Sequence, residues 1–182
     1  MRVVGISGSL RPSSYNTALL KAAATELPVE AAFLLWRGLG LLPAYREDCD
    51  GPRIPPAVAS LRRTLSGADA VLIATPEYNG SIPGSLKNAL DWASRPFPDN
   101  CLRRKPVAVI GASTGLFGAI WAQAELRRIL KKIGADVLEA ELPVPAAHAA
   151  FTPDARLRER ELANALRGIV HQLVSKTERA AA

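Results

Sequence analysis

The chain is poor in cysteine and histidine, with two residues of each among its 182 residues. Cys49 and Cys101 lie far apart and form no C-x-x-C pair, so neither a disulfide framework nor a zinc site is expected. This cysteine usage is typical of a reduced, cytoplasmic protein. His148 and His171 have no ligand partners at metal spacing, so we predict no metal site.

Long apolar runs are also missing from the sequence. No stretch of about 18 apolar residues occurs, so no membrane-spanning helix is expected. The apolar start MRVVGISGSL is too short for a signal peptide and is followed by Pro12 and Asn16, so we interpret it as a first buried strand. With 48% hydrophobic residues, the chain is predicted to form one domain over 1–182 with a full core.

Basic residues outnumber acidic residues by 23 to 17, which gives a net charge of +6. Such a balance suits a basic surface in solution, and it also attracts anions such as phosphates and dinucleotides. Nucleic acid is not expected as a partner, because the basic residues sit in helical repeats without interleaved exposed aromatics. Examples are Arg127, Arg128, Lys131 and Lys132.

Short apolar runs alternate with amphipathic stretches along the chain. Strands are predicted at 2–7, 29–36, 70–75, 106–112 and 136–142. Helices are predicted at 17–26, 56–66, 84–95 and 120–133, and a last one from Pro153 with Thr152 as its N-cap. This alternation predicts an α/β domain with a parallel sheet between helical layers. Five strands favour the flavodoxin-like order 2-1-3-4-5, in which the loops after strands 1 and 3 open the ligand crevice.

The loop after the first strand, GSLRPSSYN (8–16), is rich in hydrogen-bond donors. It matches neither G-x-x-x-x-G-K-[ST] nor G-x-G-x-x-G. It nevertheless lies just before a predicted helix N-terminus, where free amides and the helix dipole favour an anion. The pattern fits a terminal phosphate, and it also fits a turn that only caps the helix. The candidate residues are Ser9, Arg11, Ser14, Tyr15 and Asn16.

The loop after the third strand, PEYNGSIPG (76–84), combines stiffness with little charge. Pro76 restricts the backbone, Glu77 is the only carboxylate, and Tyr78 can stack on a flat ring. Asn79-Gly80 is a strong hairpin signal, but no second strand follows it, so we expect a strand-to-helix loop without a hairpin. Such a loop can present its amides to a heteroaromatic ring, or it can simply connect strand and helix.

The loop after the fourth strand contains GASTG (111–115), which fits the G-x-S-x-G nucleophile elbow. Ser113, Asp136 and either histidine would follow the chain order of a Ser-acid-His triad, so a serine hydrolase is one alternative. Three features argue against it. The chain is short for that fold, no HGGG-type segment is present, and Asp136 begins the fifth strand, at the wrong end of the sheet.

Two segments resemble the signatures of the NADPH-dependent FMN reductase family. The first is Gly8-Ser9-Leu10-Arg11 with Ser14 and Asn16, and the second is Pro76-Glu77-Tyr78-Asn79 with Ser81, Pro83-Gly84, Leu86-Lys87-Asn88-Ala89 and Asp91-Trp92. The resemblance covers most of the chain. It implies a flavodoxin-like fold and an NAD(P)H-dependent oxidoreductase with non-covalent FMN, in a family that includes quinone, chromate and azo-dye reductases.

The resemblance also implies which residues hold the flavin. The phosphate would be held in the first loop, by Ser9, Arg11, Ser14 and Asn16, with Tyr15 beside them. The isoalloxazine would be held mainly through the backbone of Pro76, Glu77, Tyr78 and Asn79, and its far edge would be lined by Ser113, Thr114 and Gly115. No residue is assigned to the 2′-phosphate of NADPH.

The implied mechanism passes hydride from NADPH or NADH to FMN, and then electrons to a flavin, quinone, azo or metal-oxyanion acceptor. No side chain is predicted to act as a general acid or base, because FMN carries the chemistry. The same resemblance implies a homodimer or homotetramer with the flavin near a subunit interface. A flavodoxin-like electron carrier without an NAD(P)H site is the second alternative.

Overall fold

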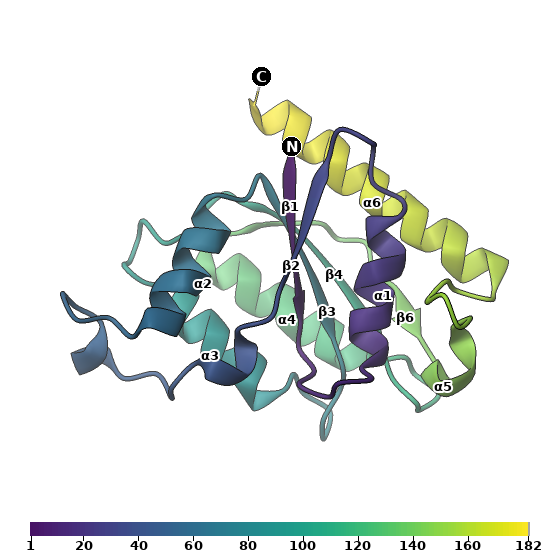
Figure 1. Cartoon of the computed structure of the whole chain (residues 1–182), viewed down its shortest axis with the longest axis horizontal. Helices are drawn as coiled ribbons and strands as arrows, with labels where there is room; N and C mark the ends of the chain where they lie inside the picture. Colours follow the sequence, from purple (N-terminus) through teal and green to yellow (C-terminus); the bar gives the residue numbers. More distant parts are fainter. Residues whose placement is uncertain (182) are drawn as a thin grey trace.

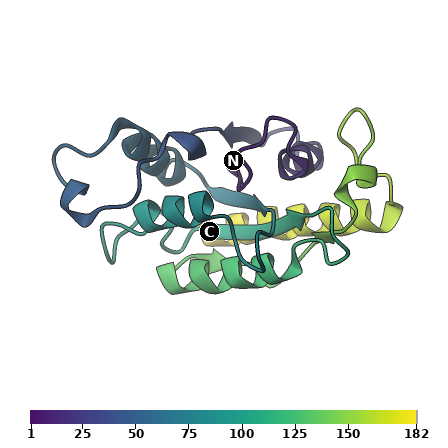
Figure 2. The same cartoon turned by 90° about the horizontal axis from the view of Figure 1, so that it is seen from below.

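Over residues 1–181, the part of the chain that the computed structural model describes, six parallel strands form one sheet between two layers of helices (Figures 1 and 2). The strand order is β2-β1-β3-β4-β5, and β6 also pairs with β4. The strands are β1 (Arg2–Ser7), β2 (Ala32–Trp36), β3 (Ala70–Thr75), β4 (Pro106–Ala112), β5 (Asp136–Val137) and β6 (Pro143–Val144). This confirms the predicted α/β class and strand order, but the sheet has six strands instead of five.

The helices follow the predicted alternation with the strands. They are α1 (Tyr15–Ala24), η1 (Leu39–Leu41), η2 (Glu47–Cys49), α2 (Pro56–Ser66), α3 (Gly84–Ala93), α4 (Ile120–Ile133), α5 (Ala147–Ala150) and α6 (Arg160–Ala181). The predicted bounds of α2 and α4 are confirmed, and Gly134 ends α4 with a positive φ of 97°. Among the described residues, no helix combines the length and the apolar composition that a bilayer crossing needs.

Each face of the sheet carries its own hydrophobic core. Successive side chains of a strand point to opposite faces, and β3 is buried on both. Val71 and Ile73 pack in the core under α2, α3 and α4, whereas Leu72 and Ala74 pack in the core under α1 and α6. The continuous apolar runs of β3 and β4 therefore reflect their central place in the sheet.

The predicted strand 136–142 is wrong in extent. The chain leaves the sheet after Val137 and returns as β6, and both short strands pair with β4. Polar side chains of α4 hold the intervening segment. The backbone N–H of Leu142 donates to Gln123 Oε1 at 3.1 Å, and Arg127 pairs with Glu141 at 2.5 Å. The Gln123 contact satisfies a backbone N–H that a continuous strand would pair in the ladder, and the ion pair holds the segment through its side chains.

The predicted start of the last helix is also wrong. Thr152 does not cap α6, because its Oγ1 accepts a hydrogen bond at 3.0 Å from the backbone N–H of Arg156 and closes a local turn. Phe151 and Leu157 form an antiparallel bridge around this turn, and α6 begins only at Arg160. The one-turn helix α5 before it is not predicted from the sequence.

Smaller boundary errors have local causes. Helix α1 begins two residues before the predicted Thr17, because Ser14 is its N-cap and accepts from the Thr17 N–H at 3.3 Å. Strand β2 begins at Ala32 instead of Val29, which is fully exposed in a turn. Helix α3 ends at Ala93, two residues before its predicted end.

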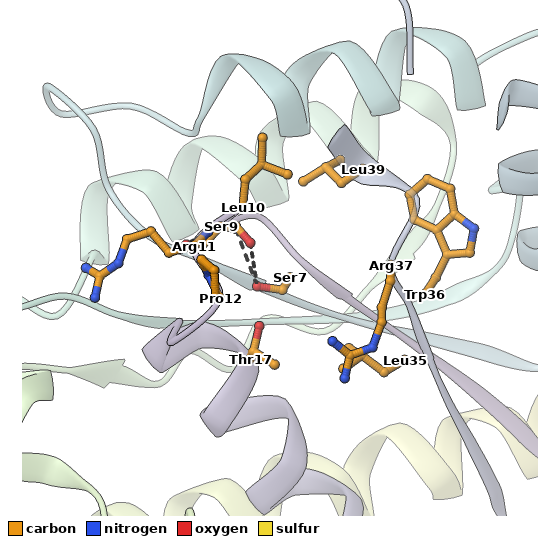
Figure 3. Close-up of a pocket in the computed structure, with 10 residues that line it drawn as sticks. All are labelled: Ser7, Ser9, Leu10, Arg11, Pro12, Thr17, Leu35, Trp36, Arg37 and Leu39. Atoms are coloured by element: carbon orange, nitrogen blue, oxygen red, sulfur yellow. Dashed lines mark hydrogen bonds between the residues drawn. The ribbon is translucent and has the colours of Figure 1, made fainter. Parts of the chain in front are cut away.

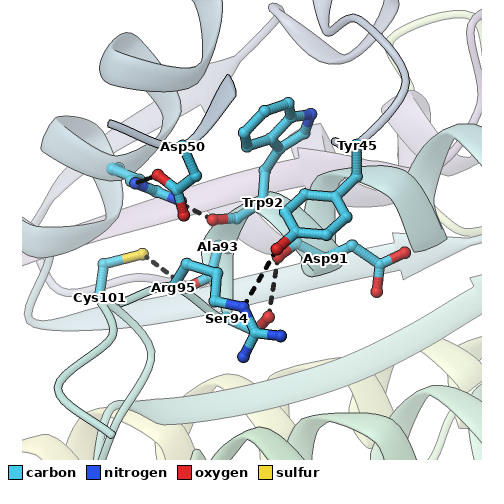
Figure 4. A network of polar contacts seen from close by, with 9 residues as sticks. Tyr45, Asp50, Asp91, Trp92, Ala93, Ser94, Arg95 and Cys101 are labelled. Carbon is cyan, nitrogen blue, oxygen red and sulfur yellow. Dashed lines mark hydrogen bonds and ion pairs between the residues drawn. The ribbon is translucent and has the colours of Figure 1, made fainter. Parts of the chain in front are cut away.

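Polar contacts hold the long connection between β2 and α2 against α3 and the residues after it. In Figure 4, Arg95 Nε donates to the Tyr45 hydroxyl at 3.2 Å. Asn88 accepts from the Tyr45 N–H at 2.8 Å and donates to the Pro43 carbonyl at 2.9 Å, and Trp92 Nε1 donates to the same carbonyl at 2.8 Å. The Arg62 guanidinium binds both carboxylate oxygens of Asp50, at 2.7 and 2.9 Å, and holds the pKa of that carboxyl below its usual value. Asn88 and Trp92 of the second signature therefore anchor this connection.

The ligand loops share one edge of the sheet. β1 and β3 run in parallel, and in Figure 1 their carboxyl ends lie at the lower edge, which Figure 2 views from below. The loops after β1, β3 and β4 therefore come together where a crevice is expected in this strand order.

Candidate functional site

One cavity brings the three predicted loops together. Its lining consists of Ser9, Arg11, Ser14, Tyr15, Asn16, Pro76, Glu77, Tyr78, Ala112, Ser113 and Thr114. Two predicted site residues are not in this lining. Asn79 lies in the turn next to Tyr78, and Gly115 is exposed just beyond Thr114. Loops that are distant in the sequence thus form a single site.

Asn16 fastens the start of α1 to the end of β4. Its side chain is 3% exposed, and both polar atoms are paired with the backbone of Ala112. Nδ2 donates to the carbonyl and Oδ1 accepts from the N–H, each at 3.0 Å. The Asn16 amide therefore holds the cavity wall in place, and each of its two polar atoms already makes one hydrogen bond to β4.

Arg11 is the only lysine or arginine in the cavity lining. Its guanidinium carbon lies 5.6 Å from the centre of the Tyr15 ring, and that ring stacks parallel to Phe151 at 6.2 Å. Among the described residues, no carboxylate forms an ion pair with Arg11. Its positive charge is therefore available to an anion.

Asn79-Gly80 forms a tight turn, so the expectation that no hairpin forms here is wrong. Both residues have positive φ, 54° and 76°, as the two central positions of a type I′ turn require. Tyr78 and Ser81 exchange two backbone hydrogen bonds across the turn, at 2.9 and 3.1 Å. One residue pair closes the turn without longer strands, and it leaves the Tyr78 side chain 47% exposed.

The carboxylates of Glu77 and Glu125 link this turn to α4 through hydrogen bonds. Glu77 Oε2 accepts from the Ala122 N–H at 3.1 Å, at a helix start that has no side-chain cap of its own. In the reverse direction, Glu125 Oε2 accepts from Ser81 Oγ at 2.7 Å and from the Ile82 N–H at 3.3 Å. The role of Glu125 is not predicted from the sequence, because a glutamate on a helix carries no local signal for such a contact.

The third loop does not assemble a hydrolase triad. Ser113 Oγ accepts from the Gly115 N–H at 3.1 Å, and no histidine lines the cavity. Asp136 pairs with the first residue of β4, so it lies at the opposite end of the sheet from Ser113, and it forms an ion pair with Lys176 at 2.8 Å. His148 lines a different cavity, next to Phe151. The serine hydrolase alternative has no geometric support.

Comparisons with known proteins agree with this architecture. The model of the NADPH-dependent FMN reductase family matches residues 1–149. An NAD(P)H-dependent FMN reductase of Pseudomonas aeruginosa is 43% identical over 166 residues, which cover 89% of each chain. A 2-hydroxy-1,4-benzoquinone reductase of a Burkholderia species is 41% identical over 129 residues, which are 71% of this chain and 69% of the relative.

A solved structure extends the similarity over nearly the whole chain. The flavoenzyme FerB of Paracoccus denitrificans, an NAD(P)H:(acceptor) oxidoreductase, superposes with a TM-score of 0.85 and 37% sequence identity. The match covers 98% of this chain and 97% of FerB. On these grounds, the chain belongs to the NADPH-dependent FMN reductase family.

Proposed function

We propose that this protein is an NAD(P)H-dependent oxidoreductase that uses non-covalently bound FMN to reduce a small-molecule acceptor. The observation that carries the proposal is the single cavity in which the loops after β1, β3 and β4 meet. The family match and the flavin and quinone reductases among the relatives support the same function. The proposed unit is one FMN-binding domain over residues 1–182.

The donors of the cavity fit a flavin phosphate. The Arg11 guanidinium has no acidic partner among the described residues, and the hydroxyls of Ser9 and Ser14 lie in the same lining. A phosphate binds most strongly to such charge-assisted donors. The only carboxylate in the lining, Glu77, accepts from the start of α4. We therefore assign the phosphate to the first loop, with Tyr15 and Asn16 as its walls.

The rest of the flavin would lie against the more open loops. The cavity measures about 100 Å³, below the roughly 300–1,000 Å³ of typical organic-ligand sites, so it encloses only part of an FMN-sized ligand. We assign the ring to the backbone of the 76–84 loop and to the third loop. The residues concerned are Pro76, Glu77, Tyr78, Asn79, Ser113, Thr114 and Gly115.

Bound FMN would supply the hydride-accepting chemistry, while the protein positions it. Asn16 holds the first loop against β4, and Glu77 and Glu125 hold the second loop against α4. These contacts keep the walls of the site in place without a general acid or base. Backbone amides of a rigid loop are well suited to stabilise negative charge on a reduced ring.

We propose a quinone-like acceptor, which would bind beside Tyr78 of the cavity and the exposed aromatic side chains near the beginning of α4. Tyr78 is 47% exposed, and Phe117 and Trp121 are 59% and 52% exposed, with their ring centres 4.8 Å apart. Flat aromatic faces suit a planar acceptor. The quinone reductases among the relatives support this class, and flavins, azo dyes and metal oxyanions are the alternatives to compare.

We also propose a homodimer or homotetramer that resides in the cytoplasm. Leu116 is 84% exposed and, with Phe117 and Trp121, forms an apolar patch at the beginning of α4. Apolar patches of this kind mark association surfaces in many soluble proteins. The cytoplasmic location is supported by the free cysteines Cys49 and Cys101, because disulfides are rare in that compartment.

Anaerobic mixing of the FMN-loaded protein with NADPH tests the proposed function. The flavin absorbance is expected to bleach, and added benzoquinone is expected to restore it, whereas free FMN serves as the control for uncatalysed reduction. An FMN-loaded protein that does not bleach would contradict the reductase and favour the electron carrier. A protein that takes up no FMN would contradict every flavin-based function.

A further inference from the structure

A second cavity lies beside the first loop, on the side that faces β2 (Figure 3). It shares Ser9 and Arg11 with the flavin cavity, so the loop 8–16 forms a wall between the two. The remaining lining consists of Ser7, Leu10, Pro12, Thr17, Leu35, Trp36, Arg37 and Leu39. Its volume is about 160 Å³.

Arg37 lines this cavity but not the flavin cavity, whereas Arg11 lines both. In Figure 3 the Arg37 side chain extends beside Leu35 with the guanidinium towards Thr17, whereas the Arg11 guanidinium points away from the cavity. The side-chain hydrogen bonds among the lining residues are three weak ones of 3.4 Å, two between Ser7 and Ser9 and one from the Arg11 backbone N–H to Ser9 Oγ, so the Arg37 guanidinium takes part in none of them. No carboxylate is in the lining. A guanidinium and several hydroxyls without an acidic residue are the donors that a phosphate monoester requires.

The backbone around Arg37 is held in place by packing. The preceding Trp36 is 9% exposed and belongs to the hydrophobic core, which anchors the end of β2. A Cβ on Gly38 would lie 2.4 Å from the Trp36 ring, so the chain can turn closely over this ring only with glycine there. A Cβ on Gly40 would lie 3.4 Å from Leu10, so the connection also meets the first loop. The backbone segment that carries Arg37 is thus held by the packing of Trp36 and by the approach of Gly40 to Leu10.

The position of Arg37 in the fold suggests the ligand. It is the first residue after β2, and β2 is the neighbour of β1 in the sheet. In open α/β sheets, ligands bind outside the carboxyl ends of the strands, so a phosphate group held by Arg37 would lie next to the first loop and to the flavin phosphate assigned there. With the flavin phosphate assigned to the other side of the loop, this cavity is available to a second nucleotide.

We propose that Arg37 binds the 2′-phosphate of NADPH and makes the protein prefer NADPH to NADH. The inference rests on the proposed function, because it concerns the electron donor of the same reaction. The pyridine nucleotide would then lie across the first loop, with its adenosine end in the β2 cavity and its nicotinamide end towards the flavin.

Binding of adenine nucleotide fragments tests the proposal without turnover. Calorimetric titration of FMN-loaded protein with 2′,5′-ADP and with 5′-AMP should show tighter binding of 2′,5′-ADP. Arg37→Ala should reduce that preference about tenfold or more, because a charge-assisted hydrogen bond is lost. Arg53→Ala is the matched control. It removes the same charge from an exposed arginine in the same connection, which lines neither cavity, and should leave the preference unchanged.

Steady-state kinetics provide the second readout. Arg37→Ala should raise the KM for NADPH about tenfold and leave the KM for NADH, the kcat and the FMN affinity unchanged. An equal change for both nucleotides, or a loss of FMN affinity in place of a nucleotide effect, would overturn the proposal. If Arg37→Ala keeps the wild-type preference for NADPH while the enzyme still turns over, this inference alone would be overturned. A wild-type protein that oxidises neither nucleotide would overturn the proposed function and this inference together.

Discussion

Asn16 and Glu77 show how a side chain in a ligand site can serve the protein itself. The sequence predicts flavin contacts for both, and both line the cavity. In the structure, Asn16 binds the backbone of Ala112 and Glu77 binds the start of α4. Local sequence cannot reveal such pairings, because their partners lie tens of residues away. Either residue can support the flavin by holding a loop, whether or not it touches the ligand.

Arg11 is the residue whose loss should most directly weaken the proposed phosphate site. We expect Arg11→Ala to cost about 1.5–3 kcal/mol of FMN binding, roughly a ten- to hundredfold increase in Kd, because a charge-assisted contact is lost. Titration of FMN fluorescence measures this effect. Arg53→Ala is the control for the change in net charge. An FMN affinity that is the same in Arg11→Ala as in the wild type would remove Arg11 from the site.

Cys101 is not expected to take part in the proposed redox reaction. Its Sγ donates to the Ala93 carbonyl at 3.4 Å (Figure 4), and burial raises the pKa of the thiol to about 11. The thiolate, which is the reactive form of cysteine, is therefore scarce near neutral pH. Cys101 is accordingly a packing residue next to the connection between β2 and α2.

Among the elements, the turn at Asn79-Gly80 and helix α4 are joined by hydrogen bonds. The turn is closed by the Tyr78–Ser81 pair, and the glutamates at 77 and 125 link it to α4. Because the second glutamate binds two donors of the loop, a shift of α4 would also move the loop that carries Tyr78. The helix thereby sets the position of the ring-binding loop.

Gly80→Ala should destabilise the protein, because Gly80 has a φ of 76° and a side chain in this left-handed region costs about 1–2 kcal/mol. Gly168→Ala offers a matched control. Gly168 lies inside α6, and an added Cβ would meet no atom within 4 Å. That substitution should raise the free energy of unfolding by about 0.5–1 kcal/mol. Urea denaturation measures both effects. Stabilisation by both alanines would contradict the positive φ at Gly80.

For the whole molecule, the strand order determines where chemistry can occur. The two cores lie on opposite faces of one sheet, and the three ligand loops lie along its carboxyl edge. The exposed apolar patch at the beginning of α4 borders the same edge, because Glu77 and Glu125 join that helix to the second loop. Association through this patch would therefore bring a second copy next to the flavin.

Light scattering should therefore give a mass of two or four times the 19.4 kDa of one chain. Leu116→Glu should shift the protein towards the monomer, because it places a charge in the apolar patch. Val29→Glu provides the control, since Val29 is fully exposed in the turn before β2 and far from the patch in sequence. A wild-type mass of 19.4 kDa would contradict the proposed oligomer.

Elements whose signals are local could be predicted from the sequence. The bounds of β1, β3 and β4 are as predicted, since short apolar runs buried on both faces are continuous in sequence. The split between β5 and β6 could not be predicted, because it involves a backbone N–H between them, that of Leu142, which bonds to the distant Gln123 side chain of α4. The start of α6 was missed for a related reason, since the Thr152 hydroxyl closes a turn with Arg156 instead of capping a helix.

The α/β class and the three loops that could bind a ligand follow from the sequence alone, because periodicity and loop composition are local properties. The strand order follows from the number of strands and the topology rules for parallel sheets. The side chains that are left to bind a ligand can be identified only in the folded molecule. It pairs Asn16 with β4 and Glu77 with α4, leaves Arg11 without an acidic partner among the described residues, and directs Arg37 into a second cavity. These outcomes depend on groups that meet only when the sheet and its helices have packed.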